Sequence, residues 1–288
     1  MSSHDPQALK AQFLAQRGTW SPQWASLLAL DPSYFAAYLQ LRAAASKGQH
    51  ITPKFQELIH LSVASVVSTM FIPGIEAHAR AALDAGATKE EILEVLALTS
   101  VCGIHSISCG LPVLMEVLAE QGMLPERPEE LDERRQRLKE DFHTKRGYWG
   151  KTWDDVLAFD PDFFEAYTVS DISFSHSLEF HLTAWLSLRW TEDPDDTVLQ
   201  QFSAEPFREG KNHLSAKEKE LIYCAFDACA THMYTPGLKL HMQNAIRYGA
   251  TPEELMQVLE LASLIGVHTS MVGAEVLERT LKMGESSS

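Results

Sequence analysis

Two glutamate–histidine pairs recur in this chain at one spacing. Glu57 is followed by His78, and Glu220 is followed by His241 after the same interval. Each glutamate lies in an otherwise apolar run, and a carboxylate that is buried there needs a polar partner. A histidine held by a carboxylate has a fixed tautomer and can act as a general acid or base. The spacing therefore predicts either acid–base chemistry at His78 and His241 or a packing device that both places share.

The pairs belong to a duplicated segment. Residues 51–118 (copy one) and 214–280 (copy two) align without a gap at an offset of 163, which also pairs His105 with His268. In each copy a Gly-Ala-Thr step ends one helix and caps the next. Apolar residues recur at helical spacing around it. We therefore predict helices almost throughout, with the glutamate and both histidines of a copy brought into one pocket.

Copy two carries more titratable groups than copy one. His232 and Tyr234 stand where copy one has Thr69 and Phe71, so we expect turnover in copy two. The first histidine would be the acid or base, the glutamate would orient it, and the other groups would polarise a carbonyl or hold a carboxylate. The predicted catalytic residues are His241, Glu220, His232, Tyr234 and His268, with His78, Glu57 and His105 as their equivalents in copy one.

Other charged side chains lie near the key histidines. Arg80 and Arg247 are expected to hold a substrate carboxylate, although a solvated helix face is the commoner position for arginine. His60 and Glu76 of copy one are expected at the surface. Three histidines and a glutamate would suit zinc or iron, but no compact ligand spacing such as HExxH is present. We therefore predict no bound metal, and a metal-dependent enzyme stays an alternative.

A second match lies upstream of the duplicated segments. Residues 17–38 match 146–167 at an offset of 129, so copy two carries about 34 more residues, near 175–211. Such an insertion usually decorates one face, often near a site. The highly charged segment between the copies is typical of a solvated helix or connector. The predicted domains are 1–124 and 146–283, with a charged connector at 125–145.

The composition limits the partners. The formal net charge of −15 disfavours nucleic acid and anionic membrane surfaces, because both bind clustered Lys and Arg. It still permits a small acidic substrate that one local cation holds. No apolar run approaches the roughly 20 residues of a membrane span, and the polar start lacks a signal-peptide core. We expect a cytoplasmic protein whose four cysteines are buried thiols.

The duplicated motifs resemble those of the carboxymuconolactone decarboxylase and AhpD-like superfamily. A histidine is followed about eight residues later by GAT-x-EE and an apolar helix, as in LKLHMQNAIRYGATPEELMQVLELASLIGVH and IEAHARAALDAGATKEEILEVLALTSVCGIH. Glu57 and Glu220 match the family's glutamate in the preceding helix. The resemblance implies an all-α fold of two tandem AhpD-like helical-bundle domains. It also implies a homo-oligomer, which for a tandem chain would be a trimer.

The peroxidase branch of this superfamily carries cysteines seven and four residues before the histidine. Here those positions are Phe71 and Gly74 in copy one, and Tyr234 and Gly237 in copy two, so no dithiol can form there. The resemblance therefore favours the decarboxylase branch, which works without a cofactor. We predict a cofactor-free lyase that acts on a small carboxylated, lactone-type metabolite by His/Glu acid–base catalysis. The alternative is a non-catalytic ligand-binding or scaffolding oligomer of the same fold.

Overall fold

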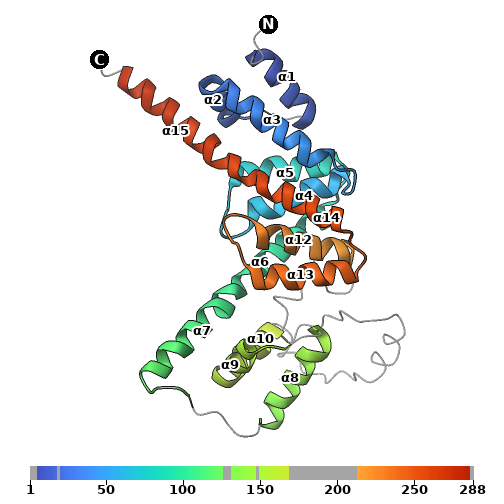
Figure 1. Cartoon of the computed structure of the whole chain (residues 1–288), viewed down its shortest axis with the longest axis vertical. Coiled ribbons are helices and arrows are strands. Elements are labelled where there is room, and N and C mark those ends of the chain that lie inside the picture. The colour runs from blue at the N-terminus through green and yellow to red at the C-terminus, as the bar shows by residue number, and fades with distance from the viewer. Residues whose placement is uncertain (1–4, 18–19, 126–130, 147–148, 169–212, 286–288) are drawn as a thin grey trace. The chain divides into compact units, whose positions relative to one another are not determined.

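The structure is a computed structural model that describes residues 5–17, 20–125, 131–146, 149–168 and 213–285 (Figure 1). The described residues form α-helices joined by short turns, and no strand occurs among them, which confirms the predicted all-α fold. The predicted insertion at 175–211 lies outside the described residues. By its internal contacts the chain divides into two compact units, Met1–Ser100 with His213–Ser288 and Val101–Asn212.

The first unit holds most of the helices. They are α1 (Pro6–Arg17), α2 (Pro22–Leu30), α3 (Pro32–Lys47), α4 (Pro53–Ser65), α5 (Ile72–Asp84), α6 (Lys89–Ser100), α12 (Ala216–Ala228), α13 (Thr235–Arg247), α14 (Pro252–Ser263), the 3-10 turn η3 (Leu264–Gly266) and α15 (Val267–Glu285). The second unit holds the 3-10 turn η1 (Val101–Ile104), α7 (His105–Glu120), α8 (Glu133–Arg146), α9 (Lys151–Phe159) and α10 (Pro161–Thr168).

Local sequence signals begin and end these helices. Thr52, Ser215 and Thr251 cap α4, α12 and α14, each accepting a hydrogen bond from a backbone N–H of the first turn. Gly86 and Gly249 have φ angles of 90° and 88°, a conformation that glycine adopts without steric cost. The two Gly-Ala-Thr steps are therefore the helix end and helix start that the sequence predicts.

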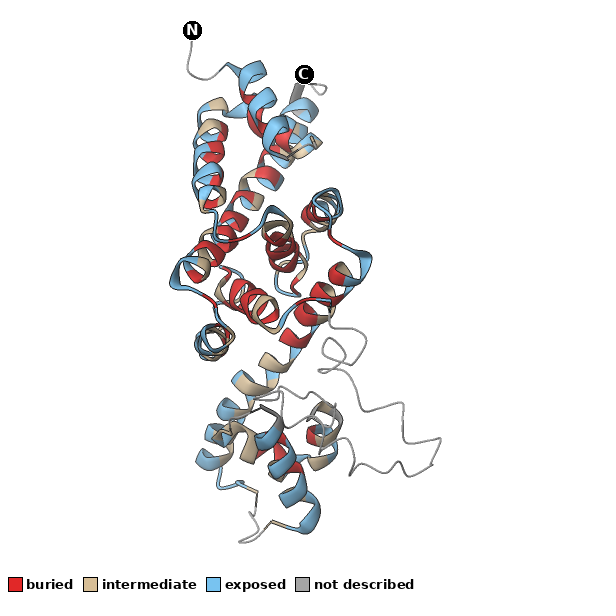
Figure 2. Ribbon diagram, turned by 90° about the vertical axis from the view of Figure 1, so that its right-hand side faces the viewer, coloured by how far each residue is buried: buried red, intermediate tan, exposed pale blue. Residues whose placement is uncertain are grey.

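The core of the first unit is built around α4 and α12, the matching helices of the two copies. α4 packs on α5, and α12 packs on α13. In addition α4 contacts α12 and α14, and α12 contacts α6. Figure 2 shows that the buried residues of these helices turn toward the centre of the group. The two copies therefore share one core, whereas the sequence predicts a separate domain for each.

A buried polar contact joins the copies at two matching places. Lys219 Nζ lies 2.6 Å from Glu94 Oε1, and both side chains are at most 3% exposed. The other oxygen of Glu94 accepts a hydrogen bond from the backbone N–H of Leu214 at 2.9 Å. At the matching place, Gln257 Oε1 accepts from the backbone N–H of Ile51 at 3.0 Å. The backbone N–H before α12 is thus bound by the carboxylate of an ion pair, and the backbone N–H before α4 is bound by a neutral amide.

The first unit has a second cluster, where the last helix of copy two packs on the beginning of the chain. α15 lies beside α2 (Figure 1), and Gln23 donates a hydrogen bond to Glu275 at 2.9 Å. The cluster contains Leu9, Phe13, Trp24, Leu27, Leu28, Phe35, Tyr38, Leu39, Val267, Met271 and Ala274. α15 therefore carries residues of copy two into the surroundings of copy one.

The second unit repeats the aromatic part of this cluster. Phe142 and Phe164 match Phe13 and Phe35 at the offset of 129, and the two ring pairs have centroid distances of 5.7 Å and 5.6 Å. Phe142 is 2% exposed and lies on α8, within the charged segment 125–145. The described part of that segment is therefore a helix with a charged outer face and an apolar face in a core, rather than a connector.

Two helical stretches are long and apolar enough to cross a membrane by composition alone. They are Lys89–Glu120 and Pro252–Met283, with mean hydropathies of 1.7 and 1.4. Each contains a 3-10 turn between two α-helices. In the first, Glu91 accepts a hydrogen bond from Lys54 at 2.6 Å, and a paired charge of this kind is costly in lipid. These stretches are weak indications of a span, and the absence of membrane contact stays a prediction.

Candidate active site

The predicted Glu57–His78 pair forms in the structure. Glu57 lies on α4 and His78 on α5, and His78 Nδ1 is 2.7 Å from Glu57 Oε2. Arg42 of α3 approaches the other oxygen, with its Nη2 3.4 Å from Glu57 Oε1. The side chains of Arg42 and His78 are 7% and 6% exposed. Because Nδ1 of His78 faces the carboxylate, Nε2 is the nitrogen that can exchange a proton with a ligand.

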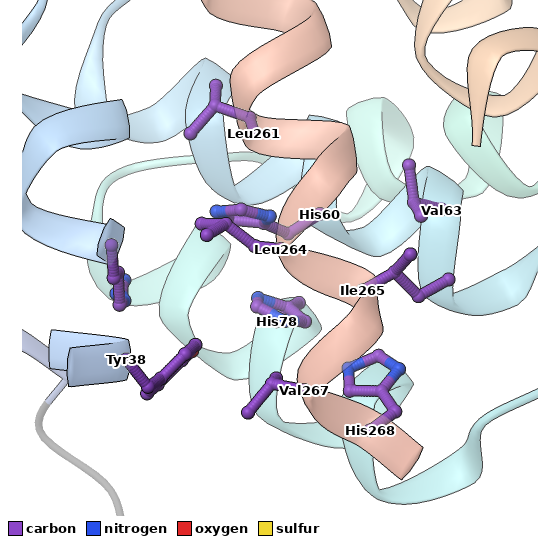
Figure 3. A pocket seen from close by; sticks show the side chains of 10 residues that line it. Tyr38, His60, Val63, His78, Leu261, Leu264, Ile265, Val267 and His268 are labelled. Carbon is purple, nitrogen blue, oxygen red and sulfur yellow. The ribbon is translucent and has the colours of Figure 1, made fainter. Parts of the chain in front are cut away.

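A cavity lies beside these charges. It is small and partly open to solvent. Figure 3 shows the imidazoles of His60 and His78 near each other, with His268 on a helix that crosses in front of them. The ring centroids of His60 and His78 are 4.8 Å apart. The lining residues are Tyr38, Arg42, His60, Val63, His78, Leu261, Leu264, Ile265, Val267 and His268.

His268 belongs to copy two but lines the cavity of copy one. Its ring stacks on Phe71 of copy one with a centroid distance of 4.1 Å. The structure therefore places His268 with His78, whereas the sequence grouped it with His241. The reason is that α15 of copy two packs on α2, near the beginning of the chain. His105, at the matching position of copy one, begins α7 of the second unit.

The Glu220–His241 pair of copy two has the same geometry. His241 Nδ1 lies 2.7 Å from Glu220 Oε2, and the ring of Tyr223 stacks on His241 with a centroid distance of 4.2 Å. The other oxygen of Glu220 accepts a hydrogen bond from Asn244 Nδ2 at 3.3 Å. The neutral Asn244 therefore binds the carboxylate oxygen that corresponds to the one facing Arg42 in copy one.

His232 and Tyr234 lie between α12 and α13, on the loop that leads into α13. His232 Nε2 is 3.7 Å from Asp227 Oδ1, and the rings of His232 and Tyr234 have centroids 6.0 Å apart. Burial raises the pKa of Asp227 to about 7; attraction to His241 opposes the rise and repulsion from Glu220 adds to it. Burial also lowers the pKa of His232.

The positively charged side chain that lines the cavity belongs to Arg42, which was not among the residues predicted from the sequence. Arg80 and Arg247 are exposed and do not line the cavity, where Arg42 lies instead. The expectation that His60 lies at the surface was wrong, because it is 8% exposed, whereas Glu76 is exposed as expected. The only sequence signal for Arg42 was a single arginine in an otherwise apolar part of α3. Because α3 precedes the duplicated segments, no matching residue in copy two pointed to it.

The cysteines fit a structural role in three cases of four. Cys102, Cys224 and Cys229 are buried, as predicted, and Cys109 is exposed. Burial raises the pKa of the Cys224 thiol, so its reactive thiolate is disfavoured. Among the described residues of the first unit, no three His, Cys, Asp or Glu ligand atoms converge on the position of one metal ion.

Comparisons with known proteins agree with this geometry. The model of the Carboxymuconolactone decarboxylase family matches residues 32–105 and 198–277, one segment in each half of the chain. A solved structure of a candidate gamma-carboxymuconolactone decarboxylase subunit from Burkholderia xenovorans LB400 is 42% identical, with a TM-score of 0.80, over 97% of this chain and 98% of that chain. No curated protein matches significantly. The chain therefore belongs to the carboxymuconolactone decarboxylase family, as a tandem member without the paired cysteines.

Proposed function

We propose that this chain is a cofactor-free carboxy-lyase that acts, in the cavity of copy one, on a small carboxylated metabolite of the lactone type. The observation that carries the proposal is the buried series Arg42–Glu57–His78 beside that cavity. It combines a cation, an orienting carboxylate and an imidazole. The family supports the reaction class, and the name of the Burkholderia neighbour supports the lactone.

Decarboxylation needs an acceptor for an electron pair and a source of a proton. When the carbon–carbon bond to the carboxylate breaks, carbon dioxide leaves and the electron pair moves into a conjugated carbonyl of the ligand. A cation or a hydrogen-bond donor stabilises the oxygen that becomes negative. We assign this role to Arg42 and His60, which line the cavity. His78, oriented by Glu57, would then donate a proton from Nε2 to the carbon that lost carbon dioxide.

The proposal moves the working site from copy two to copy one. The sequence favoured copy two because of His232 and Tyr234. In copy one, however, a cavity lies beside the histidine, and Arg42 approaches the glutamate. Asn244 takes the corresponding place in copy two. A guanidinium keeps its charge at all physiological pH values and binds carboxylates in a fork geometry, so an anionic ligand favours the site with Arg42.

The test is the release of carbon dioxide from γ-carboxymuconolactone by the purified full chain. His78→Ala should lower kcat by at least about 10²-fold, the lower end of the contribution of a positioned acid or base. Arg42→Lys keeps the charge and loses the fork, so it should both lower kcat and raise KM. His241→Ala is the matched control, because the pair geometry is the same, and it should retain most of the activity.

The ligand-binding or scaffolding alternative predicts a different pattern. No turnover would occur in any variant, and His78→Ala and His241→Ala would lower the melting temperature by similar amounts, since each removes the histidine partner of a glutamate. Full activity of His78→Ala would refute the assignment of His78. The metal-dependent alternative predicts about one metal ion per chain by elemental analysis, and loss of activity after treatment with a chelator.

A further inference from the structure

Copy two has titratable side chains at three matching positions where copy one has none. The residues of copy one are Ala64, Thr69 and Phe71, and those of copy two are Asp227, His232 and Tyr234. The backbone is the same in both. The N–H of Tyr234 donates to the carbonyl of Asp227 at 2.9 Å, and the N–H of Phe71 donates to the carbonyl of Ala64 at 3.0 Å. The fold therefore forms with alanine at this position and does not require Asp227.

The carboxylate of Asp227 lies beside the imidazole of His232. Asp227 is 0% exposed, and neither of its carboxylate oxygens has a hydrogen-bond partner in the part of the chain that the structure describes. Oδ2 lies against Gly237, where an added Cβ would overlap it. His232 Nε2 is 3.7 Å from Oδ1, and its side chain is 13% exposed. The imidazole therefore has an edge at the surface and a buried carboxylate behind it.

Burial makes the ionised form of the Asp227 carboxyl group unfavourable. Burial raises its pKa to about 7, so the carboxyl group gains and loses its proton in the neutral range. The titratable groups that act on it from the packed helices are Glu220 and Cys224 of α12 and His241 of α13. No Lys or Arg is among them. Perturbed carboxyl groups that the fold does not need are enriched at functional sites.

We propose that Asp227 and His232 form a second acid–base site, separate from the cavity of His78, which takes an uncharged carbonyl compound. His232 is the catalytic residue: its Nδ1, the ring nitrogen that does not face Asp227, takes a proton from carbon or oxygen next to the carbonyl and later returns that proton, so only bonds to hydrogen break and form. Asp227 is a positioning residue whose negative charge stabilises the imidazolium. A carboxylate ligand is disfavoured because Glu220 repels it and no Lys or Arg compensates.

The test is the carbethoxylation of His232 by diethyl pyrocarbonate in the full chain, followed by mass spectrometry of its peptide. In this reaction Nδ1 forms a bond to the carbonyl carbon, and ethyl carbonate leaves and decomposes to carbon dioxide and ethanol. Only the neutral imidazole reacts, and an opposite charge at this distance raises the imidazole pKa by about one unit or more. The pH at which the rate reaches half its maximum should therefore lie about one unit higher in wild type than in Asp227→Asn and Asp227→Ala. A neutral lactone, γ-butyrolactone, should protect His232, and acetate should not.

The control is the peptide of His241, whose profile should be unchanged in Asp227→Ala. The same midpoint in wild type and Asp227→Ala would overturn the pairing, and protection by acetate would overturn the ligand class. The inference does not depend on the proposed decarboxylase activity. Asp227→Ala should leave carbon dioxide release from γ-carboxymuconolactone unchanged, so failure of one proposal is distinguishable from failure of the other.

Discussion

Replacing Asp227 with alanine should stabilise this protein, and the gain should depend on pH. The substitution restores the residue that copy one has at the same place, Ala64. It removes a carboxyl group that is 0% exposed and has no hydrogen-bond donor among the described residues. Most substitutions of buried residues destabilise, so a gain in the free energy of unfolding would be a specific signature of this group.

The magnitude follows from the pKa of the Asp227 carboxyl. Its value is about 7 in the folded protein, against 3.8 for the ordinary group. Because the folded state binds the proton more tightly, the protonated group is favourable below pH 4, and this stability is lost as the pH rises through 7. A difference of about three pKa units corresponds to about 4 kcal/mol. Relative to wild type, Asp227→Ala should therefore gain about 4 kcal/mol between pH 4 and pH 8.

Urea unfolding at a series of pH values, followed by circular dichroism, measures this difference. The other titratable groups are common to both proteins, so their contributions largely cancel in the comparison. The difference should change by about 1.4 kcal/mol per pH unit between pH 5 and pH 6.5. A difference that is constant with pH would refute the argument, since it would mean that Asp227 is ionised and satisfied in the folded protein.

Three further outcomes are expected. Lys219→Met should lower the free energy of unfolding by about 3–5 kcal/mol, because Glu94 remains buried without its partner. The double variant Lys219→Gln with Glu94→Gln should recover most of this loss, because Gln56 and Gln257 stand at the matching positions. Urea unfolding measures both changes, and no recovery contradicts the equivalence of the two places. Gly237→Ala should lower the melting temperature, because its Cβ would overlap Asp227 Oδ2 and the ring of Tyr234; an unchanged melting temperature contradicts this close packing. The chain should assemble as a trimer, as the family resemblance implies, and light scattering that finds a monomer argues against it.

Part of the candidate site could be predicted because its determinants are local. Threonine caps and glycines with positive φ act within one turn, so the helix boundaries at the Gly-Ala-Thr steps follow from short segments. The pairing of Glu57 with His78 was predicted because a glutamate in an apolar helix needs a partner and the next helix offers one histidine. Repetition of the pattern in copy two supported it.

The rest of the site depends on contacts between distant segments. Arg42 approaches Glu57 from a helix upstream of the duplication, and His268 reaches the cavity of copy one from copy two. No periodicity relates these residues to His78. The prediction of turnover in copy two rested on a count of titratable groups, and such a count does not report which side chains face one cavity.

The helices, the duplication, the two glutamate–histidine pairs and the absence of the paired cysteines can be predicted from the amino-acid sequence. Each of these depends on residues that are near in sequence or repeat at a constant offset. Three relations appear only in the folded chain: the copies share a core, α15 completes the cavity of the other copy, and Asp227 lies beside His232. Packing of distant helices sets these relations, because burial and partner choice depend on the whole fold rather than on the local chain.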